Sequence, residues 1–338
     1  MTRPSDRPRR AARRLVACAG LAALAIGLAG CTVDPTSGAV NPNPSDEPFT
    51  GDMRIAMITH GDDGGFWSVV RKGAEDAAAT LDEVTLDYQG SAGDAKLQSD
   101  MINAAINQGA NALAVSAPDV GAISAALDRA EAAGLPIITL NSGAELLDQR
   151  SGVLTHVGQS EKDAGIAAGE QLAKLQANDV LCIIHEENNI GLQDRCDGAA
   201  EGLGSTGKLT KVQVSGKSDP SASAQEITAA VKSANADAVL ALDPDIAMAA
   251  VGPVTGQGAT MATFDLSPEV LDAVVDGRIA FTIDQQPYLQ GYLPVVFLEL
   301  AVRNRNEVGN GQLVATGPAV ITKDNAAAIR ALSEQGTR

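Results

Sequence analysis

The chain has 338 residues, enough for about two domains of roughly 150 residues each. Hydrophobic residues make up 45% and charged residues 20%, a profile typical of a folded protein and not of a disordered one. The net charge of −17 excludes a nucleic-acid-binding surface, because recognition of phosphates requires a basic footprint.

The first thirty residues have the pattern of a secretory signal. Six arginines precede an apolar run over 15–30, which is shorter than the roughly 20 residues of a spanning helix. The run ends in Leu28-Ala29-Gly30 before Cys31, and this resembles the lipobox of bacterial lipoproteins. The resemblance implies cleavage before Cys31 and a lipid on its thiol. The alternative is an ordinary signal followed by a chance cysteine.

Residues 31–52 are predicted to form a flexible tether between the lipid and the folded part. They contain four prolines among Ser, Asn, Asp and Gly, without hydrophobic periodicity. Because residues 1–30 hold six Arg and one Asp, the mature chain would carry a charge of −22. We expect several acyl chains on Cys31 to anchor it stably at the outer face of the cell membrane, or in the periplasm.

From residue 53 onward, short apolar strands alternate with helical segments. The first series predicts strands over 54–59, 84–88, 112–116 and 137–140, and helices over 66–81, 94–107 and 120–133. The second predicts helices over 161–175, 192–203, 222–233 and 245–254, and strands over 180–184, 211–214, 238–242, 261–264 and 280–283. A helix over 289–303 and a strand over 320–322 follow. Such βα series indicate an α/β fold with two doubly wound, mostly parallel sheets.

Ligands of such sheets bind beyond the carboxyl ends of the strands, and with two lobes the natural site is the cleft between them. Distinctive side chains fall at those strand ends or on the helices that follow. They are His60, Gly64-Gly65-Phe66-Trp67, Asn141-Ser142, Arg195 with Gly198, Asp243, Phe264-Asp265 and Gln285-Gln286-Pro287.

In this order, these motifs resemble the type I (ribose/galactose-binding-like) sugar-binding proteins of ABC transporters. The resemblance covers about residues 53–325. It implies that the chain crosses between two lobes near 158–159, 285–286 and 316–318. The N-terminal lobe would comprise 53–158 and 286–317, and the C-terminal lobe 159–285 and 318–338.

A sugar or polyol site requires a flat apolar surface and a ring of fixed donors and acceptors. We expect Phe66 and Trp67 to supply the surface, since adjacent helical residues point about 100° apart and cannot both face one core. Burial of both in the core is the alternative. Arg195 offers a fork of five donors to adjacent hydroxyls or to a carboxylate, unless it forms a surface salt bridge. His60 is a further candidate contact, one residue beyond the first strand.

Asp243 and Asp265 are predicted to accept hydroxyl protons, with a role as helix N-caps as the alternative. Asn141 and Gln285 can both donate and accept hydrogen bonds. Asn188 and Asn189, in the unusual stretch 185–189, are further candidates for lining the cleft.

Other signals carry no catalytic prediction. The stretch Gly202–Lys208 matches two phosphate-binding motifs, but it follows a predicted helix and precedes a strand, the reverse of what both motifs require. His185-Glu186 lacks the second histidine of a zinc-peptidase motif. We expect no enzyme activity, no cofactor and no metal site.

Four cysteines are too few for a disulfide scaffold in a chain of this length. One lies in the signal and one would carry the lipid, which leaves Cys182 in a predicted strand and Cys196 in the next helix. Outside the cytoplasm these two can form a disulfide; the alternative is two buried thiols.

These expectations describe a monomeric lipoprotein that captures a monosaccharide or polyol and delivers it to the permease subunits of an ABC importer. A ligand sensor with the same fold is the alternative function. A transcriptional regulator with the same core is disfavoured by the export signal, the acidic charge and the missing helix-turn-helix.

Overall fold

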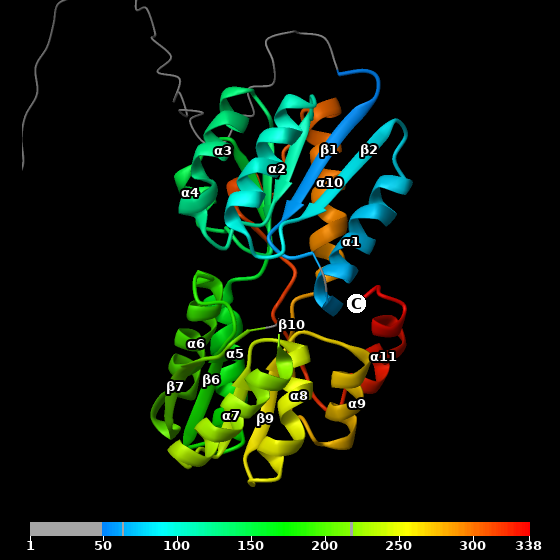
Figure 1. The fold of residues 1–338 in the computed structure, drawn as a ribbon. Coiled ribbons are helices and arrows are strands. Elements are labelled where there is room, and N and C mark those ends of the chain that lie inside the picture. The colour runs from blue at the N-terminus through cyan, green and yellow to red at the C-terminus, as the bar shows by residue number, and fades with distance from the viewer. Residues whose placement is uncertain (1–48, 63, 217–218) are drawn as a thin grey trace, which may run out of the picture. The chain divides into compact units, whose positions relative to one another are not determined.

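The computed structural model describes residues 49–62, 64–216 and 219–338. The expectations for the signal, for Cys31 and for most of the tether therefore lie outside the described residues. The described chain forms two six-stranded sheets with helices packed on both faces of each (Figure 1). The predicted α/β class with two doubly wound sheets is confirmed.

The first sheet has the strand order β11-β5-β4-β3-β1-β2, and all of its neighbouring strands are parallel. Its strands are β1 (Met53–Thr59), β2 (Val84–Gly90), β3 (Ala112–Val115), β4 (Ile137–Leu140), β5 (Val153–Gly158) and β11 (Leu313–Ala315). Alternate residues of β1 enter separate cores: Met53, Ile55 and Met57 join one, while Ala56 and Ile58 join the other. Burial on both faces explains the apolar run Ile55-Ala-Met-Ile58 within β1.

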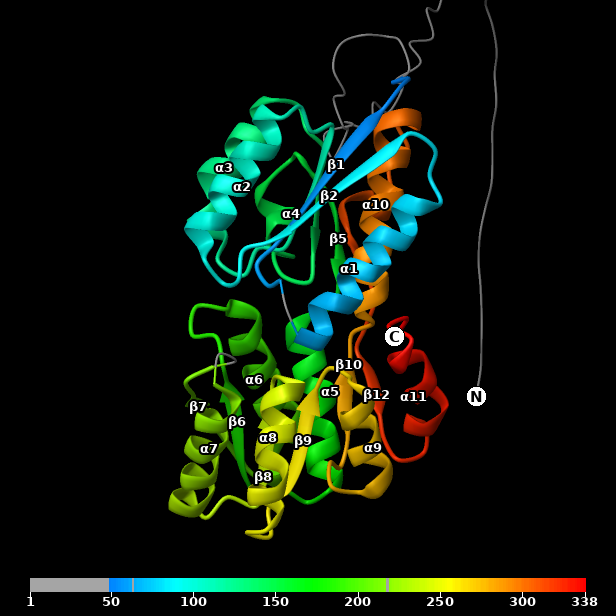
Figure 2. The same ribbon diagram turned by 45° about the vertical axis from the view of Figure 1, so that its right-hand side comes forward.

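Helices α1 (Gly64–Ala79) and α10 (Pro287–Asn304) cover one face of this sheet. Helices α2 (Ala95–Asn107) and α3 (Val120–Ala132) cover the other, together with the short α4 (Leu146–Gln149). Figure 2 shows α1 and α10 running side by side along the sheet, although most of the chain separates them in sequence.

The second sheet has the order β12-β10-β9-β8-β6-β7, with β12 antiparallel to β10 and the other neighbours parallel. Its strands are β6 (Asp179–Ile184), β7 (Lys208–Gln213), β8 (Ala238–Ala241), β9 (Thr260–Phe264), β10 (Thr282–Asp284) and β12 (Ala319–Ile321). Helices α5 (Glu161–Lys174) and α6 (Ile190–Leu203) pack on one face. Helices α7 (Pro220–Ala234), α8 (Pro244–Thr255), α9 (Pro268–Asp276) and α11 (Ala326–Glu334) pack on the other.

Glycines allow the paired helices to approach closely. A Cβ on Gly73 of α1 would collide with the Tyr288 carbonyl oxygen of α10, and one on Gly291 would collide with the Val70 carbonyl oxygen. Gly202 of α6 faces the Ile166 carbonyl oxygen of α5 in the same way. This glycine of the apparent phosphate-binding motif thus has a packing role, and the motif does lie between a helix and a strand.

The chain passes from one sheet to the other three times. Strands β1–β5 and β11 belong to the first sheet, and β6–β10 and β12 to the second. The passages follow β5, β10 and β11. Phe49, which lies in the range expected to be tether, packs on the core beneath α1 and α10. In the part of the chain that the structure describes, no helix combines the length and the apolar character needed to cross a membrane.

Candidate functional site

One small pocket brings together seven of the eight predicted ligand residues. They are His60, Phe66, Trp67, Asn141, Arg195, Asp265 and Gln285. His60 and Asn141 follow strands of the first sheet, whereas Asp265 and Gln285 follow strands of the second. The pocket has a volume of about 40 Å³, which is room for a few water molecules.

An aromatic cluster forms one wall of this pocket. The Trp67 ring packs edge-on against Phe66, with ring centroids 5.0 Å apart, and against His60 at 4.8 Å. Phe66 and Trp67 also belong to the same hydrophobic core, so the expectation that adjacent aromatics cannot share one core is wrong. Both lie in the first turn of α1, where Trp67 folds back over Gly61 and packs on the preceding loop. The two rings therefore serve the core and the pocket together.

A chain of amide hydrogen bonds links the two sheets at the site. Asn141 Nδ2 donates to Gln285 Oε1 at 3.3 Å, and Gln285 Nε2 donates to Asp265 Oδ1 at 2.8 Å. Gln290 Nε2 on α10 donates to Gln285 Oε1 at 2.9 Å and holds that amide in place. Asn141 and Asp265 both have left-handed backbones, with φ of 61° and 65°. Such strained conformations occur often at ligand sites.

Arg195 is held by a carboxylate of the protein itself. Its Nε and Nη2 donate to the two oxygens of Glu161, at 2.6 and 3.0 Å. Burial on its own would lower the pKa of Arg195, but Glu161, Asp265 and Glu186 together raise it. The residue is 4% exposed, so the alternative of a surface salt bridge is wrong. Two of its five N–H groups serve Glu161, and Nη1 is not used in this pair.

Asp243 does not line this pocket. Its Oδ1 accepts hydrogen bonds from the backbone N–H groups of Asp245 and Ile246, and it caps α8. The N-cap alternative is therefore correct for Asp243, whose contact with a ligand stays a prediction. Asp265 is not a cap, because Ser267 caps the helix that follows it.

Glu161, His185 and Glu186 line the pocket but are absent from the predicted set. Glu161 opens α5 directly after β5, and β5 itself is not among the predicted strands. The signal that could have revealed Glu161 is the pattern Ser160-x-x-Asp163 at a helix start, because Ser160 does cap α5. His185 and Glu186 follow β6, at the strand ends where sites form.

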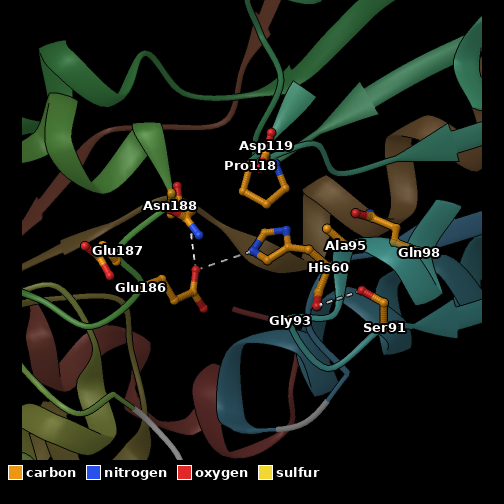
Figure 3. Close-up of a pocket in the computed structure, with 11 residues that line it drawn as sticks. His60, Ser91, Gly93, Ala95, Gln98, Pro118, Asp119, Glu186, Glu187 and Asn188 are labelled. Carbon is orange, nitrogen blue, oxygen red and sulfur yellow. Dashed lines mark hydrogen bonds and ion pairs between the residues drawn. The ribbon is translucent and has the colours of Figure 1, made fainter. Parts of the chain in front are cut away.

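A larger cavity of about 270 Å³ lies beside this pocket (Figure 3). His60, Glu186 and Asn189 line both spaces. Asn188, the other predicted asparagine, lines the larger cavity only. Asn189 also caps α6 through Gly191 N and donates to Glu186 Oε2 at 2.7 Å.

Cys182 of β6 and Cys196 of α6 form a disulfide, with a Cα–Cα distance of 5.8 Å. Both residues are fully buried. The bond ties the second sheet to the helix that carries Arg195. Among the described residues, no group of three His, Cys, Asp or Glu side chains is placed to hold a metal ion.

A family model described as the periplasmic binding protein domain matches residues 55–306. The chain belongs to this family. In agreement with the sequence motifs, similar structures include type I sugar-binding members associated with ABC transporters. As a periplasmic binding protein, the chain has a solute-binding role.

A crystal structure of a carbohydrate transporter from Acidothermus cellulolyticus 11B, in complex with myo-inositol, is similar to this periplasmic binding protein. The TM-score is 0.80 and the identity 36%, covering 85% of this chain and 100% of the other. The xylose/arabinose-binding protein of Sulfolobus acidocaldarius is 28% identical over 289 residues, 78% of this chain and 71% of that protein. A solute-binding protein from Bacillus halodurans C-125 with bound myo-inositol shares the fold, with a TM-score of 0.74, 19% identity and coverage of 84% and 99%.

Proposed function

We propose that this protein captures an uncharged monosaccharide or polyol between two lobes and delivers it to the permease of an ABC importer. The observation that carries the proposal is the convergence of aromatic, amide and carboxylate side chains from both sheets on one pocket. Aromatic rings match the C–H face of a sugar, while Asn141, Gln285 and Asp265 match its hydroxyls. The similar structure in complex with myo-inositol and the relative named as a xylose/arabinose-binding protein support the same class of ligand.

The charges of the pocket favour a ligand without an anionic group. Arg195 is already neutralised by the two-bond pair with Glu161. Asp265 and Glu186 add further negative charge to the lining. A carboxylate or phosphate on the ligand would be buried next to these carboxylates without a cationic partner, which is unfavourable. A hydroxyl, in contrast, can donate a hydrogen bond to them.

The proposed lobes are 53–158 with 286–317, and 159–285 with 318–338. The membership of β11 in the first sheet and of β12 in the second supports these boundaries. A ligand that contacts both lobes stabilises the closed arrangement over the open one, and the closed arrangement is what a permease would recognise. Capture and release of the ligand involve no chemical step and need no cofactor, and one chain supplies the whole site.

We further propose that Cys31 anchors the protein at the outer face of the membrane through its lipid. The support is the sequence Leu28-Ala29-Gly30-Cys31 at the end of an apolar run. Mass spectrometry of the N-terminal peptide from the membrane fraction is expected to show a chain that begins with a lipidated Cys31. An unmodified N-terminus at that cysteine would contradict the anchor.

The test of the ligand class is a thermal-shift screen over ribose, arabinose, xylose, glucose, galactose and myo-inositol. A ligand at 100 times its Kd adds about 2.7 kcal/mol to the free energy of unfolding, so a shift in Tm of several degrees is expected. The Trp67→Ala variant serves as the control and should show no shift. A flat response of the wild type to the whole panel would contradict the proposal.

A further inference from the structure

The larger cavity has the dimensions of a ligand site in its own right. Its volume of about 270 Å³ is close to the lower limit of roughly 300 Å³ for small-molecule pockets. Its wall combines the loop after β6, Glu186 to Asn189, with Ser91, Gln98 and Asp119 from the first-sheet side. The cavity therefore draws on both sheets, like the pocket beside it.

His60 lines both spaces, together with Glu186 and Asn189. One side of its ring meets the edge-on Trp67, 4.8 Å away between centroids, and its Nδ1 shares a hydrogen bond of 2.8 Å with Ser116 Oγ. In Figure 3 the His60 side chain lies between Glu186, Glu187 and Asn188 on one side and Ala95 and Gln98 on the other. The larger cavity therefore adjoins the position of a ligand group that packs against Trp67, and His60 contacts both.

The lining of the larger cavity suits hydroxyl groups and not an anionic group. It includes three carboxylates, three side-chain amides and the Ser91 hydroxyl, but neither Lys nor Arg and no Phe, Tyr or Trp. Several of these groups are positioned by the fold: Asp119 caps α3, and Gln98 Nε2 donates to Ser116 O at 2.7 Å. Fixed acceptors at a cavity wall can hold the hydroxyls of a ring at little cost in conformational entropy.

We infer that the site takes a two-ring ligand, a disaccharide or a glycosylated cyclitol, with one ring beside Trp67 and the second in the larger cavity. The small pocket of about 40 Å³ beside Trp67 has to widen, as the two lobes part, to admit the first ring. The inference rests on the proposed function, since it extends the same site. The second ring carries hydroxyl or amino substituents and no carboxylate or phosphate, because the carboxylates of Asp119, Glu186 and Glu187 would repel an anion.

Matched one-ring and two-ring ligands test this inference by calorimetry on the full mature chain. The pairs are myo-inositol and galactosyl-myo-inositol, glucose and maltose, glucose and cellobiose, and xylose and xylobiose. At least one two-ring member is expected to bind tenfold or more tightly than its one-ring partner. Glucuronosyl-myo-inositol is expected to bind more weakly than galactosyl-myo-inositol.

A cavity-filling substitution locates the second ring. Ala95→Phe, at the start of α2, should remove the tenfold advantage of the two-ring ligand and leave one-ring binding within twofold of wild type. Ala229→Phe on the exposed side of α7 is the matched control and should change neither. If Ala95→Phe keeps the advantage, or if no two-ring ligand exceeds its partner, the second subsite is wrong while the proposed function stands. If no ring compound binds at all, the proposed function fails and the subsite with it.

Discussion

At the scale of single residues, Arg195 and Glu161 form a buried ion pair at the candidate site. Removal of one member of a buried ion pair leaves an uncompensated charge and typically costs about 3–5 kcal/mol. We predict that Glu161→Ala lowers the free energy of unfolding by an amount in this range. Urea denaturation of the variant and the wild type measures the difference.

The control for this substitution is Glu201→Ala. Glu201 pairs with Lys162 at 2.9 Å, but both side chains are more than half exposed. Solvent-screened pairs contribute about 0–1 kcal/mol, so the control should lose little stability. Equal losses in the two variants would show that burial of the Arg195 pair has no special role.

His156 on β5 predicts a dependence of stability on pH. Its ring is fully buried, and burial lowers its pKa from 6.5 to about 4. Between pH 6.5 and pH 4 the unfolded chain binds a proton at His156 that the folded chain does not. The contribution of His156 to the free energy of unfolding is therefore fully present above pH 6.5 and is lost as the pH falls toward 4. The residue contributes about 3 kcal/mol to this loss. His156→Gln should show a correspondingly smaller decrease in urea midpoint between pH 7 and pH 4, and an identical decrease would contradict the assignment.

Most of the proposed site residues are detectable from sequence because polar or aromatic side chains at strand ends stand out from apolar strands. This holds for His60, Asn141 and Asp265, which all line the pocket. What each side chain contacts is not encoded locally. Arg195 meets Glu161, which lies 34 positions earlier, and only the packing of α5 on α6 brings them together.

At the scale of elements, the glycine contacts between α1 and α10 hold the two helices at close range. A Cβ on Gly291 would collide with the Val70 carbonyl oxygen, which belongs to the backbone and cannot move aside as a side chain can. We predict that Gly291→Ala destabilises the protein by about 1–3 kcal/mol or more, the usual cost of overpacking. Thermal or urea unfolding measures the change.

Gly252→Ala in α8 is the matched control, because no atom lies within 4 Å of its added Cβ. There the substitution reduces the entropy of the unfolded chain and should stabilise by about 0.4–1 kcal/mol. We expect Gly291→Ala to lower the free energy of unfolding and Gly252→Ala to raise it. Stabilisation by both would contradict the close contact between α1 and α10.

Most strands and helices can be predicted from runs of apolar residues and helical spacing, but β5, β11, α4, α9 and α11 are not among the predictions. In β5, the buried Thr155 and His156 interrupt the apolar run. Strand β11 has only three residues and gains its stability by pairing with β5. Helix α9 does carry a local signal, Ser267 as the cap followed by Pro268, which a search for capping residues would have detected.

At the scale of the whole molecule, three chain passages connect two sheets that each contribute half of the site. Neither sheet alone presents the aromatic cluster together with Asp265 and Gln285. In the proposed site, the affinity would therefore depend on both halves contacting one ligand, which is also the condition for ligand-driven closure. A Kd near 1 μM corresponds to about −8 kcal/mol, which a few charge-assisted hydrogen bonds and one packed aromatic face can supply.

Isothermal titration calorimetry with the best ligand of the screen, on the wild type, Trp67→Ala and Asp265→Ala, tests the binding claim most directly. Trp67 belongs to the first half of the site and Asp265 to the second. The wild type is expected to bind with a Kd in the micromolar range, and each variant should show no measurable heat of binding while its circular dichroism remains that of a folded protein. Wild-type affinity in both folded variants would contradict a ligand site built from the two sheets.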